Sequence, residues 1–136
     1  MKGKRRFHLF QFSEYKLARR RVVITGLGIV SPVGNSVEDA WQNVLAGRSG
    51  IDRITRFDVS SFPVQIAGEV RGFDLGQYLS PKEARRMDVF IHYGMAAGIQ
   101  AIRDAGLDAS GMNPERIGVS IGSGIGGLPM IESTCD

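Results

Sequence analysis

The stretch Ile117-Gly-Val-Ser-Ile-Gly-Ser-Gly-Ile-Gly-Gly127 joins five residues of strand character directly to a glycine-dense turn. A buried strand that ends in such a turn is where α/β proteins usually place their chemistry. We therefore expect residues 117–121 to form a strand of an α/β fold. The turn should then lie at the functional edge of the sheet.

This turn formally satisfies the dinucleotide-binding pattern Gly-x-Gly-x-x-Gly, from Gly122 to Gly127. The pattern normally belongs to a βαβ unit with an acidic residue about 20 positions further on. Here Pro129 follows closely and the rest of that unit is missing. We do not expect a phosphate-binding site at this turn.

Residues 21–34, Arg-Val-Val-Ile-Thr-Gly-Leu-Gly-Ile-Val-Ser-Pro-Val-Gly, predict a first buried strand and its turn, because a β-branched run ends in glycines. The dinucleotide fingerprint fails here as well, since counting from Gly26 places Ser31 at the third glycine position. A reductase-type pattern would need glycine where Val30 and Pro32 stand. The sequence therefore argues against a nicotinamide cofactor, and we expect no cofactor.

Capping residues and apolar spacing predict three helices. The first spans about residues 37–46 after a cap at Asn35 or Ser36, and the second begins at Ser80-Pro-Lys-Glu. The third spans residues 89–105, and residues 65–70 are interpreted as a short edge strand. Trp41 is interpreted as a core residue because of its place on the apolar stripe of the first helix. His92 is interpreted as structural, because it has no identifiable chemical partner.

The positive charge of the chain is concentrated at its beginning. Residues 1–21 carry eight Lys and Arg against one Glu, so the other 115 residues of this +3 chain sum to −4. Residues 1–19 are interpreted as a basic disordered leader and 20–136 as one partial domain. Global basicity is then poor evidence for nucleic-acid binding by the folded part.

Two further classes are excluded by composition. The single cysteine, Cys135, rules out an internal disulfide and a multi-cysteine metal site, and no metal site is expected. No apolar run approaches the roughly 18 residues of a membrane span, so no membrane partner is expected. One cysteine does not decide the cellular compartment, although a reducing compartment is compatible with it.

Lys82, Arg85 and Arg86 follow the Ser80 cap at i, i+3 and i+4 spacing, which would place their charges on one helix face. One interpretation is a solvated face, partly neutralised by Glu83 and Asp88. The other is a docking surface for an acidic partner. The residues alone leave both open.

Four stretches, in this order, resemble a known family: residues 21–34, Leu45-Ala-Gly-Arg-Ser-Gly-Ile, Lys82-Glu-Ala-Arg-Arg-Met-Asp and Gly122-Ser-Gly-Ile-Gly-Gly. The chain is similar to the N-terminal part of a β-ketoacyl-acyl-carrier-protein synthase, most of all to the elongating type II enzymes. The resemblance covers residues 20–132. It implies an incomplete thiolase-like α/β fold, with helices packed on a mixed sheet.

The resemblance also implies roles for particular residues. Ile125 would gate the acyl pocket, and Lys82, Arg85 and Arg86 would receive the acidic acyl carrier protein. The complete family member would be a cytoplasmic homodimer without a cofactor. It would condense an acyl thioester with malonyl carrier protein, with loss of carbon dioxide.

None of the catalytic residues of that family is expected in this chain. The nucleophilic cysteine, two histidines and a lysine would lie beyond residue 136. Cys135 does not match the nucleophile motif, and neither His8 nor His92 matches a catalytic histidine. The chain alone is therefore expected to be inactive, to expose an unpaired strand edge and to be poorly soluble.

Two alternatives from other classes remain. The chain could be a non-catalytic module that binds carrier protein through Lys82, Arg85 and Arg86. It could instead bind nucleic acid through the basic and aromatic residues of 1–21, although we expect no nucleic-acid partner.

Overall fold

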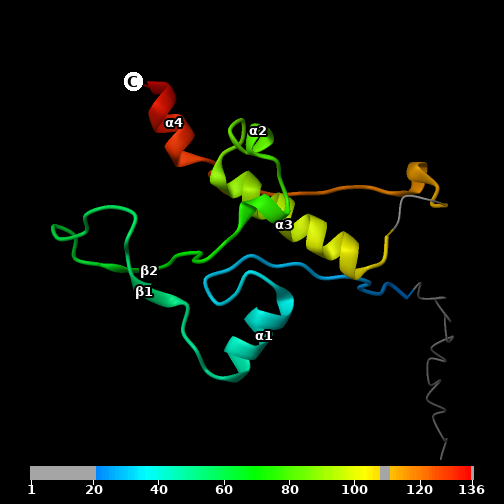
Figure 1. The fold of residues 1–136 in the computed structure, drawn as a ribbon, viewed down its shortest axis with the longest axis horizontal. Helices are drawn as coiled ribbons and strands as arrows, with labels where there is room; N and C mark the ends of the chain where they lie inside the picture. The colour runs from blue at the N-terminus through cyan, green and yellow to red at the C-terminus, as the bar shows by residue number, and fades with distance from the viewer. Residues whose placement is uncertain (1–20, 108–110, 136) are drawn as a thin grey trace, which may run out of the picture.

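The computed structural model describes residues 21–107 and 111–135 (Figure 1). The expected leader, residues 1–19, lies outside the described residues. The elements, in chain order, are α1 (Val37–Leu45), β1 (Ile51–Arg53), β2 (Ile66–Gly68), the 3-10 helix η1 (Leu75–Gln77), α2 (Pro81–Ala84), α3 (Val89–Asp104), the 3-10 helix η2 (Pro114–Arg116) and α4 (Leu128–Cys135). No helix in this part of the chain is long and apolar enough to cross a membrane.

The helices predicted from capping signals are present. α1 begins after Ser36, whose hydroxyl accepts the Asp39 N–H, and α3 begins after Asp88 and ends before Ala105. α2 has the full capping box of Ser80 and Glu83, but it ends at Ala84 and is only four residues long. α4 is an additional helix that the sequence patterns do not predict, and its Pro129 is tolerated because the first helical turn has no partner for that N–H.

The sheet departs from the sequence prediction. In the described residues it consists of β1 and β2, antiparallel, with Asp52 opposite Ala67. The edge strand predicted within residues 65–70 is therefore confirmed as β2. The strands predicted within residues 21–34 and at 117–121 are wrong for this chain, since both segments run as drawn-out coil (Figure 1) and belong to no sheet among the described residues. A strand needs a neighbouring backbone for its hydrogen bonds, and the described residues bring none beside them.

Segment 21–30 lies instead against α3. The Leu27 N–H donates to Asp104 Oδ2 at 2.8 Å, and the Ile29 N–H donates to Gln100 Oε1 at 3.1 Å. The approach is close enough to require glycine. A Cβ on Gly28 would lie 2.0 Å from the Ala97 carbonyl oxygen of α3. Helix α3 is therefore the element on which the beginning of the chain is placed.

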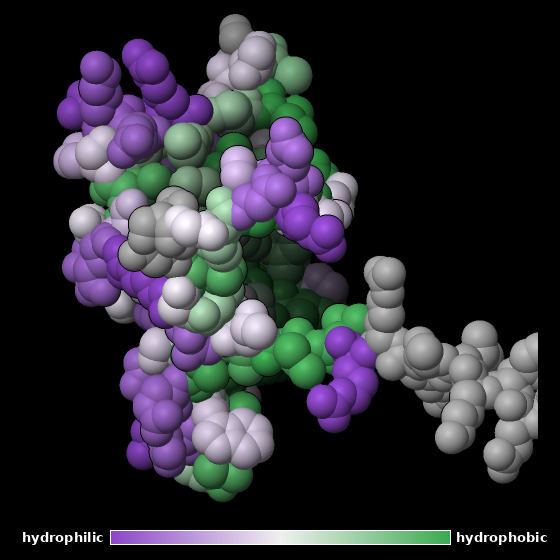
Figure 2. All heavy atoms as spheres, turned by 90° about the vertical axis from the view of Figure 1, so that its right-hand side faces the viewer, coloured by the Kyte–Doolittle hydropathy of each residue, from purple (hydrophilic) through white to green (hydrophobic). Residues whose placement is uncertain are grey.

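The buried apolar core of the described residues is small. It comprises Ala40, Val59, Leu79 and Ala96. Large apolar side chains are exposed along both extended segments, including Val22 at 93% and Val119 at 84%. Figure 2 shows apolar atoms exposed in and around a hollow on one face. Trp41 is 57% exposed, so the prediction that it is a core residue is wrong here.

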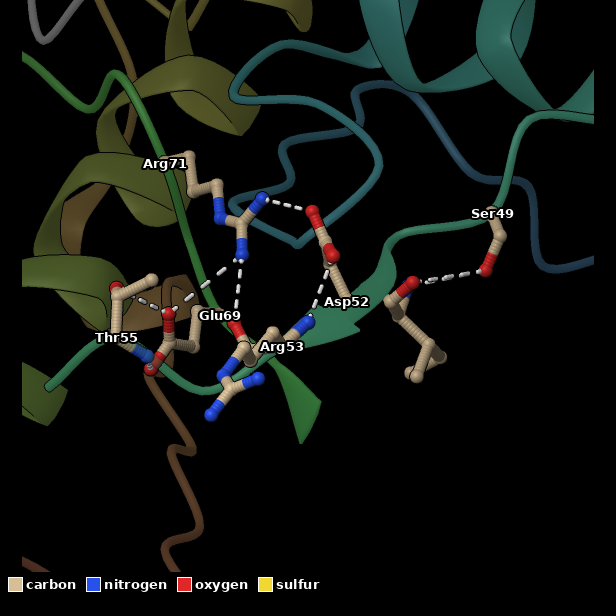
Figure 3. Close-up of polar contacts among 7 residues, drawn as sticks. Ser49, Asp52, Arg53, Thr55, Glu69 and Arg71 are labelled. Atoms are coloured by element: carbon tan, nitrogen blue, oxygen red, sulfur yellow. Dashed lines mark hydrogen bonds and ion pairs between the residues drawn. The ribbon is translucent and has the colours of Figure 1, made fainter. Parts of the chain in front are cut away.

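A polar network holds the β1–β2 pair to the segments that follow each strand (Figure 3). Arg71 Nη1 lies 2.6 Å from Asp52 Oδ2, and Arg71 Nη2 donates to the Arg53 carbonyl at 3.1 Å. Glu69, whose side chain is 9% exposed, accepts the Thr55 N–H at 3.0 Å and the Thr55 hydroxyl at 2.7 Å. The Thr55 donors lower the pKa of Glu69. The Arg71 guanidinium, followed by the Arg53 N–H, lowers the pKa of Asp52.

This network predicts acid sensitivity of the β1–β2 pair. Because both pKa values are lowered in the folded state, the two carboxylates contribute stability above their ordinary values of 4.5 for Glu69 and 3.8 for Asp52. That contribution is lost as the pH falls through the lower folded values. We expect the Thr55 amide resonance to shift towards its unfolded position in this acid range. The shift should be reduced in Glu69→Gln and unchanged in the control Glu132→Gln, and an identical acid profile in Glu69→Gln would contradict the assignment.

Candidate functional site

Ile125 lies on a bend between the extended segment 117–123 and α4, and its side chain is 77% exposed. The backbone that follows it rests on the first turns of α3. Gly126 has φ +87°, a conformation that favours glycine, and a Cβ there would lie 3.7 Å from Phe90 Cζ. A Cβ on Gly127 would lie 1.8 Å from Asp88 Oδ2, which only glycine avoids. The backbone of the turn thus packs against the side chains of Phe90 and Asp88, while the Ile125 side chain stays largely exposed.

An apolar groove of about 290 Å³ runs beside this turn. It is formed between α3 and the extended segment and is lined by Phe90, Ile91, Gly94, Met95, Ile121, Gly122 and Ser123. Such a lining suits an alkyl chain better than a charged ligand, because it offers no charged side chain. Ile125 is close to this groove in sequence but is not among the residues that line it.

We call residues 82–86 the docking segment; it comprises the last three residues of α2 and the two residues that follow this helix. Lys82, Arg85 and Arg86 occur there within five consecutive positions. The predicted single helix face is wrong, because α2 ends at Ala84 and the two arginines lie after it. The three cations nevertheless occur within one short, capped segment.

The interpretation in which Glu83 and Asp88 pair with these cations is not supported by the contacts of the two carboxylates. Glu83 Oε2 accepts the Ser80 hydroxyl at 2.6 Å and the Ser80 N–H at 3.0 Å, and these bonds lower the pKa of Glu83. Asp88 is buried at 8% exposure and binds backbone N–H groups. Within the described part of the chain, none of the three cations forms an ion pair. The docking segment, three cations and Glu83, therefore has a net charge of +2, and none of its cations is held in an ion pair among the described residues.

Cys135 and His92, the cysteine and the histidine in the described part of the chain, are not hydrogen-bonded to each other. His92 Nε2 lies 3.0 Å from the Ala84 carbonyl, which ties α2 to α3 and agrees with a structural role. Cys135 is exposed at the end of α4. Residues 21–107 and 111–135 hold no group of three or more His, Cys, Asp or Glu side chains that could bind a metal ion.

Another hollow, of about 640 Å³, lies between α1 and η1. Its carboxylates are already engaged: Asp39 accepts the Ser36 hydroxyl, and Asp74 accepts the Gly76 N–H. Asn35 Oδ1 is buried there without a partner among the described residues. We assign no chemistry to this hollow.

Asp88 is the site residue that sequence reasoning misreads. The sequence suggests it as a partner for surface cations, whereas it caps α3 and contacts the turn of Ile125. One local signal is present, since Asp directly before an apolar helical run is a preferred cap. Its second contact joins residues 42 positions apart and has no local signal.

Comparison with known proteins gives a consistent result. Residues 19–134 match the family described as Beta-ketoacyl synthase, N-terminal domain. The chain is 57% identical over 117 residues to 3-oxoacyl-[acyl-carrier-protein] synthase 2 of Vibrio cholerae, which covers 86% of this chain and 28% of that protein. With the protein of the same name from Coxiella burnetii it is 56% identical over 120 residues, covering 88% and 29%. The chain therefore spans less than a third of the length of these curated relatives.

Two solved structures are similar in fold. One is described as the ishigamide ketosynthase/chain length factor, with a TM-score of 0.60 and 38% identity over 71% of this chain and 24% of that one. The other is a type II PKS acyl-carrier protein in complex with its ketosynthase bound to the hexaketide, with a TM-score of 0.62 and 27% identity, covering 81% and 29%. These likenesses confirm the expected class, a partial thiolase-like α/β fold. With its matched residues 19–134, the chain belongs to the β-ketoacyl synthase family.

Proposed function

We propose that this chain is the N-terminal part of a 3-oxoacyl-[acyl-carrier-protein] synthase II. The complete enzyme would condense an acyl thioester with malonyl carrier protein in fatty acid elongation, forming a carbon–carbon bond and releasing carbon dioxide. The observation that carries this proposal is the 57% identity over 117 residues to a 3-oxoacyl-[acyl-carrier-protein] synthase 2. The complete enzyme would be a cytoplasmic homodimer, as is expected of the family.

The chain would supply binding surfaces rather than reacting groups. Lys82, Arg85 and Arg86 would receive the acyl carrier protein, whose acidic surface their uncompensated charges suit through steering and charge pairing. One of the solved structures similar to this chain is an acyl-carrier protein in complex with its ketosynthase, which supports this partner class.

Ile125 would act as a gate for the acyl chain. Its exposed, branched apolar side chain stands on a turn whose backbone is fixed, next to a groove of alkyl-binding character. A side chain that can change rotamer on a fixed backbone is suited to opening and closing a path for an alkyl chain.

A graft tests the proposed function. Residues 20–134 of this chain would replace the matching segment of the Vibrio cholerae protein, and the condensation of acyl and malonyl carrier protein would be measured. We expect kcat/KM within about tenfold of the parent enzyme, which corresponds to less than about 1.4 kcal/mol of lost transition-state stabilisation. A folded graft no more active than the same graft without its catalytic cysteine would overturn the proposal.

A second candidate is a non-catalytic module that binds carrier protein. It is favoured by one observation: the docking segment is capped and charged, while the described residues bring no cysteine and histidine together. This candidate predicts carrier-protein binding by the 136-residue chain together with an inactive graft. The synthase proposal predicts an active graft, so the two are separated by one assay.

A further inference from the structure

Asp88 joins two helices that are far apart in the sequence. Its Oδ1 accepts the Val89 N–H at the start of α3 at 2.5 Å, and its Oδ2 accepts the Met130 N–H in the first turn of α4 at 3.2 Å. The residue is only 8% exposed. A carboxylate at the positive ends of two helices is favourably placed, and each bond satisfies an N–H that has no partner within its own helix.

The contact between Asp88 and the start of α4 restricts which residues can stand there. Pro129 has no N–H, so Met130 provides the first donor of α4 after Leu128. Gly127 is pressed against the same carboxylate so closely that a Cβ would meet Oδ2 at 1.8 Å and Cγ at 2.4 Å. Asp88 therefore fixes the backbone two and five residues after Ile125.

The other side of Asp88 leads directly to the docking segment. Residues 82–86 end two positions before it, and the His92 ring binds the Ala84 carbonyl of α2 at 3.0 Å. The His92 N–H donates to the Asp88 carbonyl at 3.3 Å. The docking segment and the turn of Ile125 are thus both attached to the first turns of α3. Asp88 takes part in both attachments: its carbonyl accepts the N–H of His92, and its carboxylate accepts the N–H of Met130.

We propose that Asp88 is a positioning residue for the turn that carries Ile125: its carboxylate holds this turn and the start of α4 at a set place beside the docking segment. The role of that turn in selecting the acyl chain rests on the proposed function. The contacts of the Asp88 carboxylate with Val89, Gly127 and Met130, which we call the clamp, do not rest on it, because they lie within this chain.

Amide hydrogen exchange on the 136-residue chain tests the clamp. We expect the Met130 amide to be protected, and Asp88→Ala to raise its exchange rate by about tenfold or more, since a hydrogen bond to a charged acceptor is lost. Asp88→Asn keeps one carbonyl oxygen and should give a smaller increase. The matched control Asp74→Ala removes the aspartate cap of η1 and should leave Met130 unchanged. An unprotected Met130 amide, or equal exchange in Asp88→Ala and the unmodified chain, would overturn the clamp.

Acyl selectivity tests the consequence for function. In the graft, Asp88→Asn should change the ratio of kcat/KM for long and short acyl chains by about tenfold, because small misplacements of binding groups have effects of that order. The KM for carrier protein should stay within about twofold, which a general loss of structure would not allow. An unchanged chain-length ratio would overturn the link to Ile125. An inactive graft would refute the proposed function, while the exchange experiment would still decide the clamp.

Discussion

Replacing Gly28 with alanine is expected to detach segment 21–30 from α3. The new Cβ would lie 2.0 Å from the Ala97 carbonyl oxygen and 2.9 Å from the Ala101 N of the helix. These are backbone atoms, so no side-chain rotation can relieve the overlap. Crowding of this kind costs about 3 kcal/mol. It outweighs the gain of less than about 1 kcal/mol that a Gly→Ala change makes by restricting the unfolded chain.

The measurement is urea unfolding of the 136-residue chain at micromolar concentration, followed by circular dichroism in the far ultraviolet. Amide exchange at Leu27 and Ile29 reports the segment itself, because their N–H groups are bonded to Asp104 and Gln100 of α3. We expect a lower urea midpoint and faster exchange at both amides.

Gly98→Ala is the matched control, because Gly98 lies on α3 itself. A Cβ at Gly98 has no neighbour within 4 Å in this chain, and its φ is not positive. Alanine is a better helix former than glycine by about 1 kcal/mol, so this variant should be more stable than the unmodified chain. If Gly28→Ala were as stable as Gly98→Ala, the close contact between segment 21–30 and α3 would be refuted.

Features that depend on neighbouring residues are predicted correctly from this sequence, whereas features that depend on distant segments are not. The sequence predicts the first helix at about residues 37–46, and it is observed at Val37–Leu45. Its cap at Ser36 and its stop near Gly47, with φ +65°, are both close to it in the sequence. Such signals need no information about the rest of the fold.

The two strands predicted within residues 21–34 and at 117–121 depend on partners elsewhere. Both segments have strand composition, but backbone hydrogen bonds between strands join segments that are distant in the chain. In the described residues only β1 and β2 provide such a pair. A β-branched run therefore does not by itself decide whether a segment belongs to a sheet.

The candidate site shows the same division. The capping box of Ser80 and Glu83 is predicted and present, but the expected helix continues past Ala84 and the observed one does not. A new helix, α3, begins after Asp88, whose backbone is extended with φ −76° and ψ 161°. The roles of Ile125 and of the three cations stay predictions.

Reversing the three charges of the docking segment, in Lys82→Glu/Arg85→Glu/Arg86→Glu, is expected to weaken binding of the acyl carrier protein by roughly 30-fold. Each exposed charge pair contributes at most about 1 kcal/mol, and reversal adds repulsion to the lost attraction. The three positions lack ion pairs among the described residues, so their charge is available to a partner. The change should be measured by titrating acyl carrier protein onto the 136-residue chain at low and high salt.

The salt dependence and a charge-matched control make the result specific. The Debye length falls from about 10 Å at 0.1 M to about 3 Å at 1 M salt, so the difference between the variant and the unmodified chain should shrink as salt is added. The control Arg21→Glu/Arg53→Glu/Arg116→Glu makes the same change in net charge at exposed positions outside the docking segment. It should lower affinity by no more than about threefold, through the long-range field alone. Equal weakening by both triple variants would show that the carrier protein responds to net charge, and the assignment of Lys82, Arg85 and Arg86 as its docking residues would then be wrong.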